Sequence, residues 1–465
     1  MKIAVVGGGV AGSSVAIYLG SLGLDVTLFE KKSSLVDGPP MCHLHAGGNL
    51  YPDISLDQCV RLLKESIELI KLYPQAIDYR PTLIAIPTYD SNEPKDILNK
   101  LNSLQKEYEN LVKENKDNML LGEPKDYFKS YSKDELLRLK ESSEYIEWIS
   151  PFVKEVDLDS IKYPVFLVQE YGLNVFRIAA SAAILIKNIK NINLKLNSEI
   201  VKIIEKNGYE LEYVENGNKY IKKYDYLINA AGFESGKIDD YLQKRRNRFV
   251  EFKAAYVAKW EENRDKWPEV IFFGKRGSTK GMRQFTPYSG NHFQIHTMTK
   301  DVTLFDNGLV KNDTNSSMPK LDRDFIDRVY DEWKWSEVEE RTNRSIDYVS
   351  YFIKRFKSAK VAAKPLYGIQ QIPGNQESLR AAEVSFDGDS YARCEIVKAS
   401  SVLAMADDIV KKLVEKGYLD KSLYGYRDYS KFDVDNELVD NLSQQISKDR
   451  GYPKCMGMLY SKKLI

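Results

Sequence analysis

The sequence predicts an α/β fold, α+β overall, in which a parallel-sheet domain is interleaved with a domain built on an antiparallel sheet. Residues 3–30 read as an apolar strand, a glycine turn, a helix and a second strand that ends on Glu30. Residues 249–300 alternate between apolar and polar side chains, which is typical of antiparallel strands. Since 465 residues exceed what one hydrophobic core usually organises, we expect two domains.

The glycine turn has the G-x-G-x-x-G spacing of a Rossmann-like dinucleotide-binding unit. Gly7 allows the tight turn, Gly9 lets the backbone approach a diphosphate, and Gly12 lets the helix lie close to the sheet. The N–H groups of the first helical turn, which includes Val10 and Ala11, have no partners within the helix. Together with the helix dipole they form a site for an anion.

Glu30 lies 23 residues after Gly7, a spacing at which a carboxylate meets the ribose hydroxyls of an ADP moiety. An acidic residue at the end of the second strand argues against a bound 2′-phosphate. The residues therefore leave FAD or NAD as the dinucleotide.

Charge and apolar content exclude other classes of protein. Sixty-eight basic and 67 acidic residues leave no overall field that would attract nucleic acid. No apolar run approaches the roughly 20 residues that span a bilayer, and the first strand starts at Ile3 without room for a signal peptide. We expect a cytoplasmic protein without an integral membrane segment.

The four cysteines are scattered without C-x-x-C spacing, which suits a reduced compartment and argues against a zinc or iron–sulfur site. They are Cys42, Cys59, Cys394 and Cys455.

The remaining elements follow from periodicity and breakers. A long loop rich in Gly and Pro follows Glu30, and a polar tail follows Tyr424. We expect helices over 55–72, 94–142, 177–189, 320–358 and 395–413, and strands over 81–89, 163–176, 192–224 as an antiparallel pair, 224–232 and 361–373.

The N-terminal unit, the string YDYLINAAG and a long helix near the C-terminus together resemble the FAD-dependent D-amino-acid oxidase superfamily. That superfamily includes glycine oxidase and sarcosine oxidase and, more loosely, malate:quinone oxidoreductase. The resemblance implies a chain that passes back and forth between two domains. They would be an FAD-binding domain (1–80, 160–240 and 360–424) and a substrate domain (81–159 and 241–359), followed by the tail 425–465.

The resemblance also implies which residues hold FAD. The string CHLHAGGN occupies the place of a family segment beside the flavin ring. Cys42, His43 and His45 are candidates for covalent attachment, but we expect noncovalent binding. The implied cofactor residues are Gly7, Gly9, Val10, Ala11, Gly12, Glu30, Lys31, His43, His45, Ala46, Gly47, Gly48, Asn49, Val201, Ala230, Ala231 and Gly232.

The string SYARCEIVKAS departs from the family, which usually has a glycine-rich segment before its last helix. Arg393 and Lys398 stand in this string at the start of the predicted helix. A cation there opposes the helix dipole unless it has an anionic partner. That partner could be the flavin or a substrate carboxylate.

Catalytic candidates lie in the predicted strand NHFQIHT. Its alternation places His292, Gln294 and His296 on one face and the apolar residues between them on the other. The neighbouring strand offers Arg283 or Gln284, depending on register. We expect Arg283 to bind a substrate carboxylate and a histidine to take a substrate proton. The alternatives are a solvent-facing sheet surface and a metal site, which the lack of spaced Cys or acidic ligands disfavours.

Arg380 is the last candidate: it could bind substrate or neutralise reduced flavin, or simply pair with Glu383. The resemblance implies oxidation of a small amino acid, N-alkyl amino acid or 2-hydroxy acid by hydride transfer to FAD. Oxygen, a quinone or another carrier would reoxidise the flavin. The alternatives are a flavin monooxygenase and an FAD-binding assembly subunit without turnover.

Overall fold

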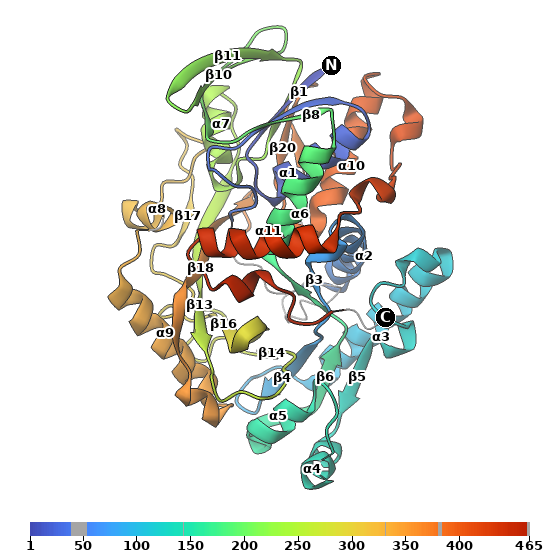
Figure 1. Cartoon of the computed structure of the whole chain (residues 1–465), viewed down its shortest axis with the longest axis vertical. Coiled ribbons are helices and arrows are strands. Elements are labelled where there is room, and N and C mark those ends of the chain that lie inside the picture. Colours follow the sequence, from blue (N-terminus) through green and yellow to red (C-terminus); the bar gives the residue numbers. More distant parts are fainter. Residues whose placement is uncertain (39–53, 143, 331, 380–383, 463–465) are drawn as a thin grey trace.

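The computed structural model describes residues 1–38, 54–142, 144–330, 332–379 and 384–462. Two large sheets organise the chain (Figure 1). One is a six-stranded, mainly parallel sheet and the other a nine-stranded, mainly antiparallel sheet. The chain crosses between them several times, because strands of both sheets come from early, middle and late parts of the sequence.

The six-stranded sheet has the order β19-β20-β12-β1-β2-β8. Its central strands are apolar and buried, as expected for parallel strands covered on both faces. Helices α1, α2, α6 and α10 belong to this half, and α1 packs against α6 and α10. The elements are β1 (Lys2–Val6), β2 (Asp25–Phe29), β8 (Ile192–Lys195), β12 (Tyr226–Asn229), β19 (Val384–Phe386), β20 (Tyr391–Cys394), α1 (Val10–Ser21), α2 (Leu56–Leu72), α6 (Val175–Asn188) and α10 (Val402–Glu415).

Helix α2 begins where its sequence predicts, because the Ser55 side chain accepts a hydrogen bond from the Gln58 N–H. The helix predicted from residue 395 starts later. Strand β20 extends to Cys394 beside β12, and the short 3-10 helix η8 (Ala399–Ser401) precedes α10. The predicted boundary was wrong because residues 395–398, between β20 and η8, are not helical.

The nine-stranded sheet has the order β17-β13-β16-β15-β14-β4-β6-β5, with β18 also paired to β13. Strands β6 and β18 fall within the ranges predicted for the FAD-binding domain, but both pair in this sheet. The boundaries predicted at 160 and 360 therefore lie too early. The strands are β4 (Thr82–Pro87), β5 (Phe128–Tyr131), β6 (Ile161–Val168), β13 (Arg248–Lys259), β14 (Glu269–Phe272), β15 (Arg283–Tyr288), β16 (His292–Thr297), β17 (Leu309–Lys311) and β18 (Lys360–Pro373).

One face of the nine-stranded sheet packs on helices through an apolar cluster that includes Phe285, Phe293 and Ile295. The other face contributes Val257, Ile271 and other residues to the core shared with the six-stranded sheet. The remaining helices are α3 (Pro94–Glu114), α4 (Lys133–Ser142), α5 (Ser150–Glu155), α7 (Ser235–Tyr241), α8 (Arg323–Val329) and α9 (Trp335–Ser350).

Two small sheets complete the fold. Strands β9, β10 and β11 form an antiparallel ribbon, as predicted from their alternation. Strands β3 and β7 form a two-stranded sheet. Their bounds are β3 (Ile77–Asp78), β7 (Gly172–Leu173), β9 (Ser198–Glu205), β10 (Tyr209–Glu215) and β11 (Asn218–Tyr224).

The tail predicted as 425–465 is folded over its described part. Helix α11 (Asn436–Asp449) packs on α6 and crosses the middle of the molecule (Figure 1). Beyond it, Arg450 donates to the carbonyls of Leu35 and Val36, and Tyr452 donates to the Pro365 carbonyl. The tail therefore ties the loop after β2 to strand β18.

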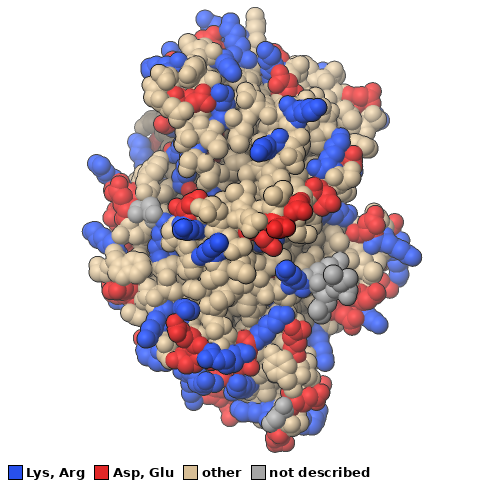
Figure 2. All heavy atoms as spheres, viewed as in Figure 1, with Lys and Arg blue, Asp and Glu red and all other residues tan. Residues whose placement is uncertain are grey.

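Lys and Arg side chains are interspersed with Asp and Glu on the face shown in Figure 2. That mixture matches the near-zero net charge of +1. Within the described ranges, we find no helix with the length and apolar content needed to span a lipid bilayer.

Candidate functional site

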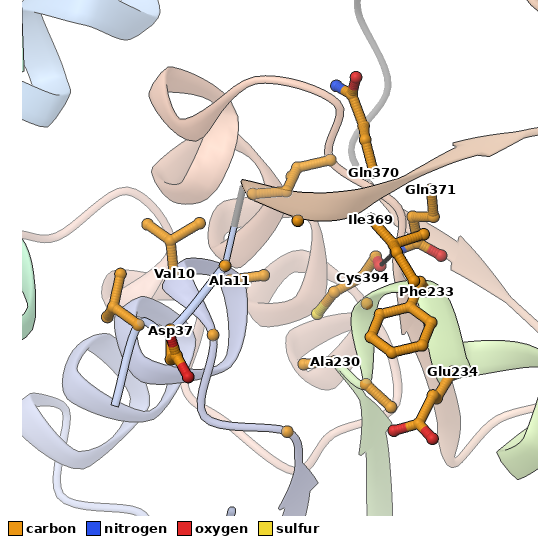
Figure 3. A pocket seen from close by; sticks show the side chains of 18 of the residues that line it. Val10, Ala11, Asp37, Ala230, Phe233, Glu234, Ile369, Gln370, Gln371 and Cys394 are labelled. Carbon is orange, nitrogen blue, oxygen red and sulfur yellow. Dashed lines mark hydrogen bonds between the residues drawn. The ribbon is translucent and has the colours of Figure 1, made fainter. Parts of the chain in front are cut away.

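A cavity of about 380 Å³ lies between the two sheets. Its walls come from the glycine turn, the loop after β2, the segment after β12, strand β18 and the segment after β20 (Figure 3). Val10 and Ala11 of α1 lie on one side of the view, and Ile369, Gln370 and Gln371 of β18 on the other. Its lining residues come from both large sheets.

The glycine turn has the geometry that its sequence predicts. Gly7 has a φ of +102°, and a Cβ there would lie 2.4 Å from the Ala230 carbonyl oxygen. A Cβ on Gly12 would lie 1.8 Å from the Gly7 carbonyl oxygen, so only glycine lets α1 lie this close to β1. Gly9 differs, because nothing lies within 4 Å of where its Cβ would be.

The start of α1 is open to a ligand. Gly9 is the N-cap residue and no side chain caps the helix. Gly9, Val10 and Ala11 all line the cavity. The uncapped N–H groups and the helix dipole suit a diphosphate in the space beside Gly9.

Glu30 lies at the end of β2 and lines the cavity. Its carboxylate accepts hydrogen bonds from the N–H groups of Gly8, at 2.7 Å, and Lys32, at 2.8 Å. Burial raises the pKa of Glu30, while these two N–H groups act in the opposite direction. The backbone thus fixes the carboxylate in the orientation that a ribose would meet.

Lys31 also lines the cavity and pairs with Glu234, which follows β12. Burial alone would lower the pKa of Lys31, but the Glu234 carboxylate raises it above its ordinary value. Tyr330 accepts a further hydrogen bond from Lys31 at 2.9 Å. These contacts join the two halves of the molecule at one end of the cavity.

Ala230, Ala231 and Gly232 line the cavity directly after β12, at the position that the resemblance implied. Strand β9 contributes Ser198, Glu199 and Ile200, whereas Val201 is not a lining residue. The resemblance implied a contact of the adenine with the Val201 main chain, which does not depend on the direction of its side chain, and that role stays a prediction.

Strand β18 and the segment after β20 close the cavity. Gln371 donates to the Cys394 carbonyl at 2.8 Å, which holds these strands together. Lys398 and Ser400 line the cavity at the start of η8. Arg393 does not, because it is buried in β20 and paired with Asp239.

Strand β16 presents the face that its alternation predicts. Phe293 and Ile295 pack in the apolar cluster, while Gln294 and His292 are 0% and 7% exposed on the other face. The alternative of a solvent-facing surface is therefore wrong. His296 lines the cavity, but His292 lies farther along the strand, 3.4 Å from the Cys455 sulfur in the tail. Burial lowers the pKa of His292.

The register of β15 on β16 decides which neighbour stands beside His296. Gln284 is paired with His296 and also lines the cavity. Arg283 points to the other face, with its guanidinium carbon 5.1 Å from the ring centres of Tyr348 and Phe352. The expectation that Arg283 binds substrate in this cavity is therefore wrong, since a strand turns consecutive side chains to opposite faces.

Several predicted residues lie outside the described part of the chain. They are His43, His45, Ala46, Gly47, Gly48, Asn49 and Arg380, together with Cys42 and Glu383. Their roles remain predictions. Among the residues that the structure does describe, no group of three or more His, Cys, Asp or Glu side chains is arranged to hold a metal ion.

Sequence reasoning missed Lys253 and Gln370, which both line the cavity. Lys253 donates to the Gln370 oxygen at 3.0 Å. Alternation within RFVEFKAAYVAK indicates a shared face but does not say which partner strand covers it. Gly368 lies opposite Lys253 in the sheet, so the Lys253 side chain has no cross-strand side chain beside it.

The residues present fit FAD. An open glycine turn at an uncapped helix and a fixed carboxylate at the end of β2 suit its ADP part, and a long cavity reaches the second sheet. The glycine turn, Glu30 and the segment 230–232 would hold the ADP part. The segments at 368–371 and 396–400 would meet the rest.

Comparison with known proteins agrees with this fit. The DAO family model, described as FAD dependent oxidoreductase, matches residues 2–334. No curated protein sequence matches the chain significantly.

The fold resembles several solved structures. Glycine oxidase from Geobacillus kaustophilus is 14% identical, with a TM-score of 0.56 over 92% of this chain and 98% of that one. L-amino acid deaminase from Proteus vulgaris is 13% identical, with a TM-score of 0.58 over 93% and 96%. Glycerol-3-phosphate dehydrogenase from Bacillus halodurans, complexed with FAD, is 11% identical, with a TM-score of 0.58 over 98% and 81%.

The family match covers most of the chain, and the fold likeness extends over nearly all of it. The predicted fold class, the FAD cofactor and the assignment as an enzyme are confirmed. The chain belongs to the DAO family of FAD-dependent oxidoreductases.

Proposed function

We propose that this enzyme oxidises a small amino acid, an N-alkyl amino acid or a 2-hydroxy acid. The observation that supports it most is that His296 and Gln284 lie side by side in the cavity that also holds the glycine turn. Glycine oxidase and L-amino acid deaminase are among the similar folds, so an amino acid is the first substrate to test. Glycerol-3-phosphate dehydrogenase adds a hydroxyl compound to the panel.

His296 would handle the proton. FAD, when bound, supplies the acceptor for the hydride that leaves the substrate carbon. Oxidation of an amine or alcohol also releases a proton from nitrogen or oxygen, and an imidazole can take it near neutral pH. Gln284 lies 3.3 Å from the Nδ1 atom of His296 and so orients the ring, leaving Nε2 as the atom that receives the proton.

Lys398 replaces Arg283 as the candidate for the substrate's anionic group. It lines the cavity immediately before η8, and its positive charge favours an anion. Arg380 remains a second candidate. A carboxylate held by Lys398 would leave the α-carbon and its amine or hydroxyl to face the nine-stranded sheet.

The test is anaerobic addition of a substrate panel to the purified yellow protein. The panel contains glycine, N-methylglycine, proline, other small amino acids, 2-hydroxy acids and glycerol 3-phosphate. We expect at least one amino or hydroxy acid to bleach the flavin absorbance. NADH and NADPH are added to separate samples, and bleaching by these two alone would favour the monooxygenase alternative. No bleaching by any compound of the panel would contradict the proposal.

Two further measurements complete the proposal. Reoxidation of the reduced protein by oxygen and by a soluble quinone compares the possible electron acceptors. Acid precipitation tests the binding mode, because flavin that stays in the supernatant is held noncovalently, as we expect.

A further inference from the structure

A chain of hydrogen-bonded side chains leads from His296 into the interior. The Oε1 atom of Gln284 lies 3.3 Å from His296 Nδ1. The Nε2 amide group of Gln284 donates to Glu269, and Glu269 also accepts from Arg80. The register of the sheet builds this chain, because Ile271 is paired with Gln284 and Glu269 lies two residues before it on the same face of β14.

The ion pair in this chain is deeply buried. Arg80 is 2% exposed, and Glu269 and Gln284 are 0% exposed. Removing two charges from water is costly, and apolar residues of similar volume often stabilise a fold at least as well. Stability alone therefore does not explain an ion pair here. Its connection to a histidine in the cavity supplies a reason.

The donors and acceptors in this series of hydrogen bonds determine which nitrogen of His296 carries the hydrogen. A carboxylate paired with an arginine only accepts hydrogen bonds, so Gln284 must turn its NH₂ group toward Glu269. Its carbonyl oxygen then faces His296 Nδ1. Since that oxygen also only accepts, Nδ1 must carry the hydrogen, and Nε2 is left with the lone pair.

We propose that Glu269 and Arg80 are positioning residues that hold His296 in the Nδ1-protonated tautomer, acting through Gln284. The inference rests on the proposed function only where it concerns turnover, because the tautomer itself exists without substrate. It assigns a catalytic purpose to two residues that touch neither substrate nor cofactor.

The Glu269→Gln substitution should reverse the direction of the hydrogen bonds between residue 269, Gln284 and His296. Arg80 would still donate to the oxygen of the new amide, which would turn its own NH₂ group toward Gln284. Gln284 would then present its NH₂ group to His296 Nδ1, and the hydrogen would move to Nε2. The change keeps the shape of the side chain and removes one charge.

The tautomer is read from the imidazole ¹⁵N chemical shifts of histidine-labelled protein, with His296→Gln identifying the signal. We expect the wild type to show a protonated Nδ1, Glu269→Gln to show mainly a protonated Nε2, and Gln284→Met, which keeps the ion pair, to show a mixture. In Glu269→Gln we expect flavin reduction by substrate to slow about tenfold or more, with the flavin spectrum unchanged.

The matched control is Glu337→Gln, which removes a carboxylate that accepts from Arg328 at 2.9 Å on the outer helices. It should leave the His296 tautomer as in the wild type. An unchanged tautomer in both Glu269→Gln and Gln284→Met would overturn the proposal, as would an equal change in the control. If no substrate reduces the wild-type flavin, the proposed function fails while the ¹⁵N measurement still decides the tautomer.

Discussion

The two walls of the cavity are built in different ways. The glycine turn lines the cavity mainly with backbone, and its shape is fixed by close contacts of Gly7 and Gly12. The sheet wall lines the cavity with side chains, and their placement depends on which strands pair and in what register. The shape of the backbone wall therefore depends on positions that lack a side chain. The chemistry of the side-chain wall depends on which residues the strand pairing makes neighbours.

The most severe break of the backbone wall is Gly12→Val. Its Cβ would lie 1.8 Å from the Gly7 carbonyl oxygen, so α1 would have to leave the sheet. We expect this variant to lose FAD uptake and much of its folded population, as measured by flavin absorbance and circular dichroism.

Gly9→Ala is the matched control, because Gly9 has a φ of −64° and nothing lies within 4 Å of its Cβ position. We expect the unfolding temperature of the apoprotein to be unchanged and FAD affinity to fall about tenfold, since the methyl group enters the space for the diphosphate. Wild-type affinity would mean that the diphosphate does not approach Gly9.

The side-chain wall is tested by comparing two histidines of the same strand. His296 lines the cavity, whereas His292 contacts Cys455 and the Ser289 carbonyl. We expect His296→Asn to slow flavin reduction by about a hundredfold, the range of a lost general base, and His292→Asn to change it less than about twofold. Equal rates in stopped-flow experiments on the two variants would remove His296 from the mechanism.

A smaller effect is expected where the tail supports the backbone wall. Arg450 donates to the carbonyls of Leu35 and Val36 and to the Ser34 hydroxyl, and Val36 lines the cavity. Arg450→Met should weaken FAD binding by about tenfold, which corresponds to the loss of one charged hydrogen bond. Lys448→Met, on the exposed face of α11, should bind FAD like the wild type in a fluorescence titration.

The smallest effect concerns pH. Burial lowers the pKa of His292, so the folded protein binds fewer protons than the unfolded chain just below the ordinary histidine value of about 6.5. The folded state therefore has its full stability above about pH 6.5, where His292 is neutral in both states, and it loses stability as the pH falls. Between pH 7 and 5, denaturant unfolding should show less loss of stability in His292→Gln than in the wild type. Parallel curves would contradict it.

The sequence could predict the backbone wall nearly in full, because glycine spacing and the acid after β2 are local signals. It could also predict that His292 and His296 share a face, since alternation is local. It could not choose between Arg283 and Gln284, because a shift of one residue exchanges the two faces of a strand. The chain through Glu269 was missed for the same reason, since it joins strands that only the folded sheet brings together.

The sequence assigned no role to the tail, because its contacts with Leu35 and Val36 join residues more than 400 positions apart, and no periodicity indicates them. The start of the helix predicted from residue 395 was misplaced because residues 395–398 continue the apolar periodicity of α10 without being helical.

The grip of Arg450 on the loop after β2 has a consequence for biosynthesis. The glycine turn, Glu30 and Val36 all lie within the first 38 residues. The Arg450 guanidinium that holds the Val36 carbonyl is synthesised 414 residues later. A ribosome-bound nascent chain would thus carry an unfinished pocket until Arg450 has been synthesised. We expect flavin to be captured once helix α11 has docked.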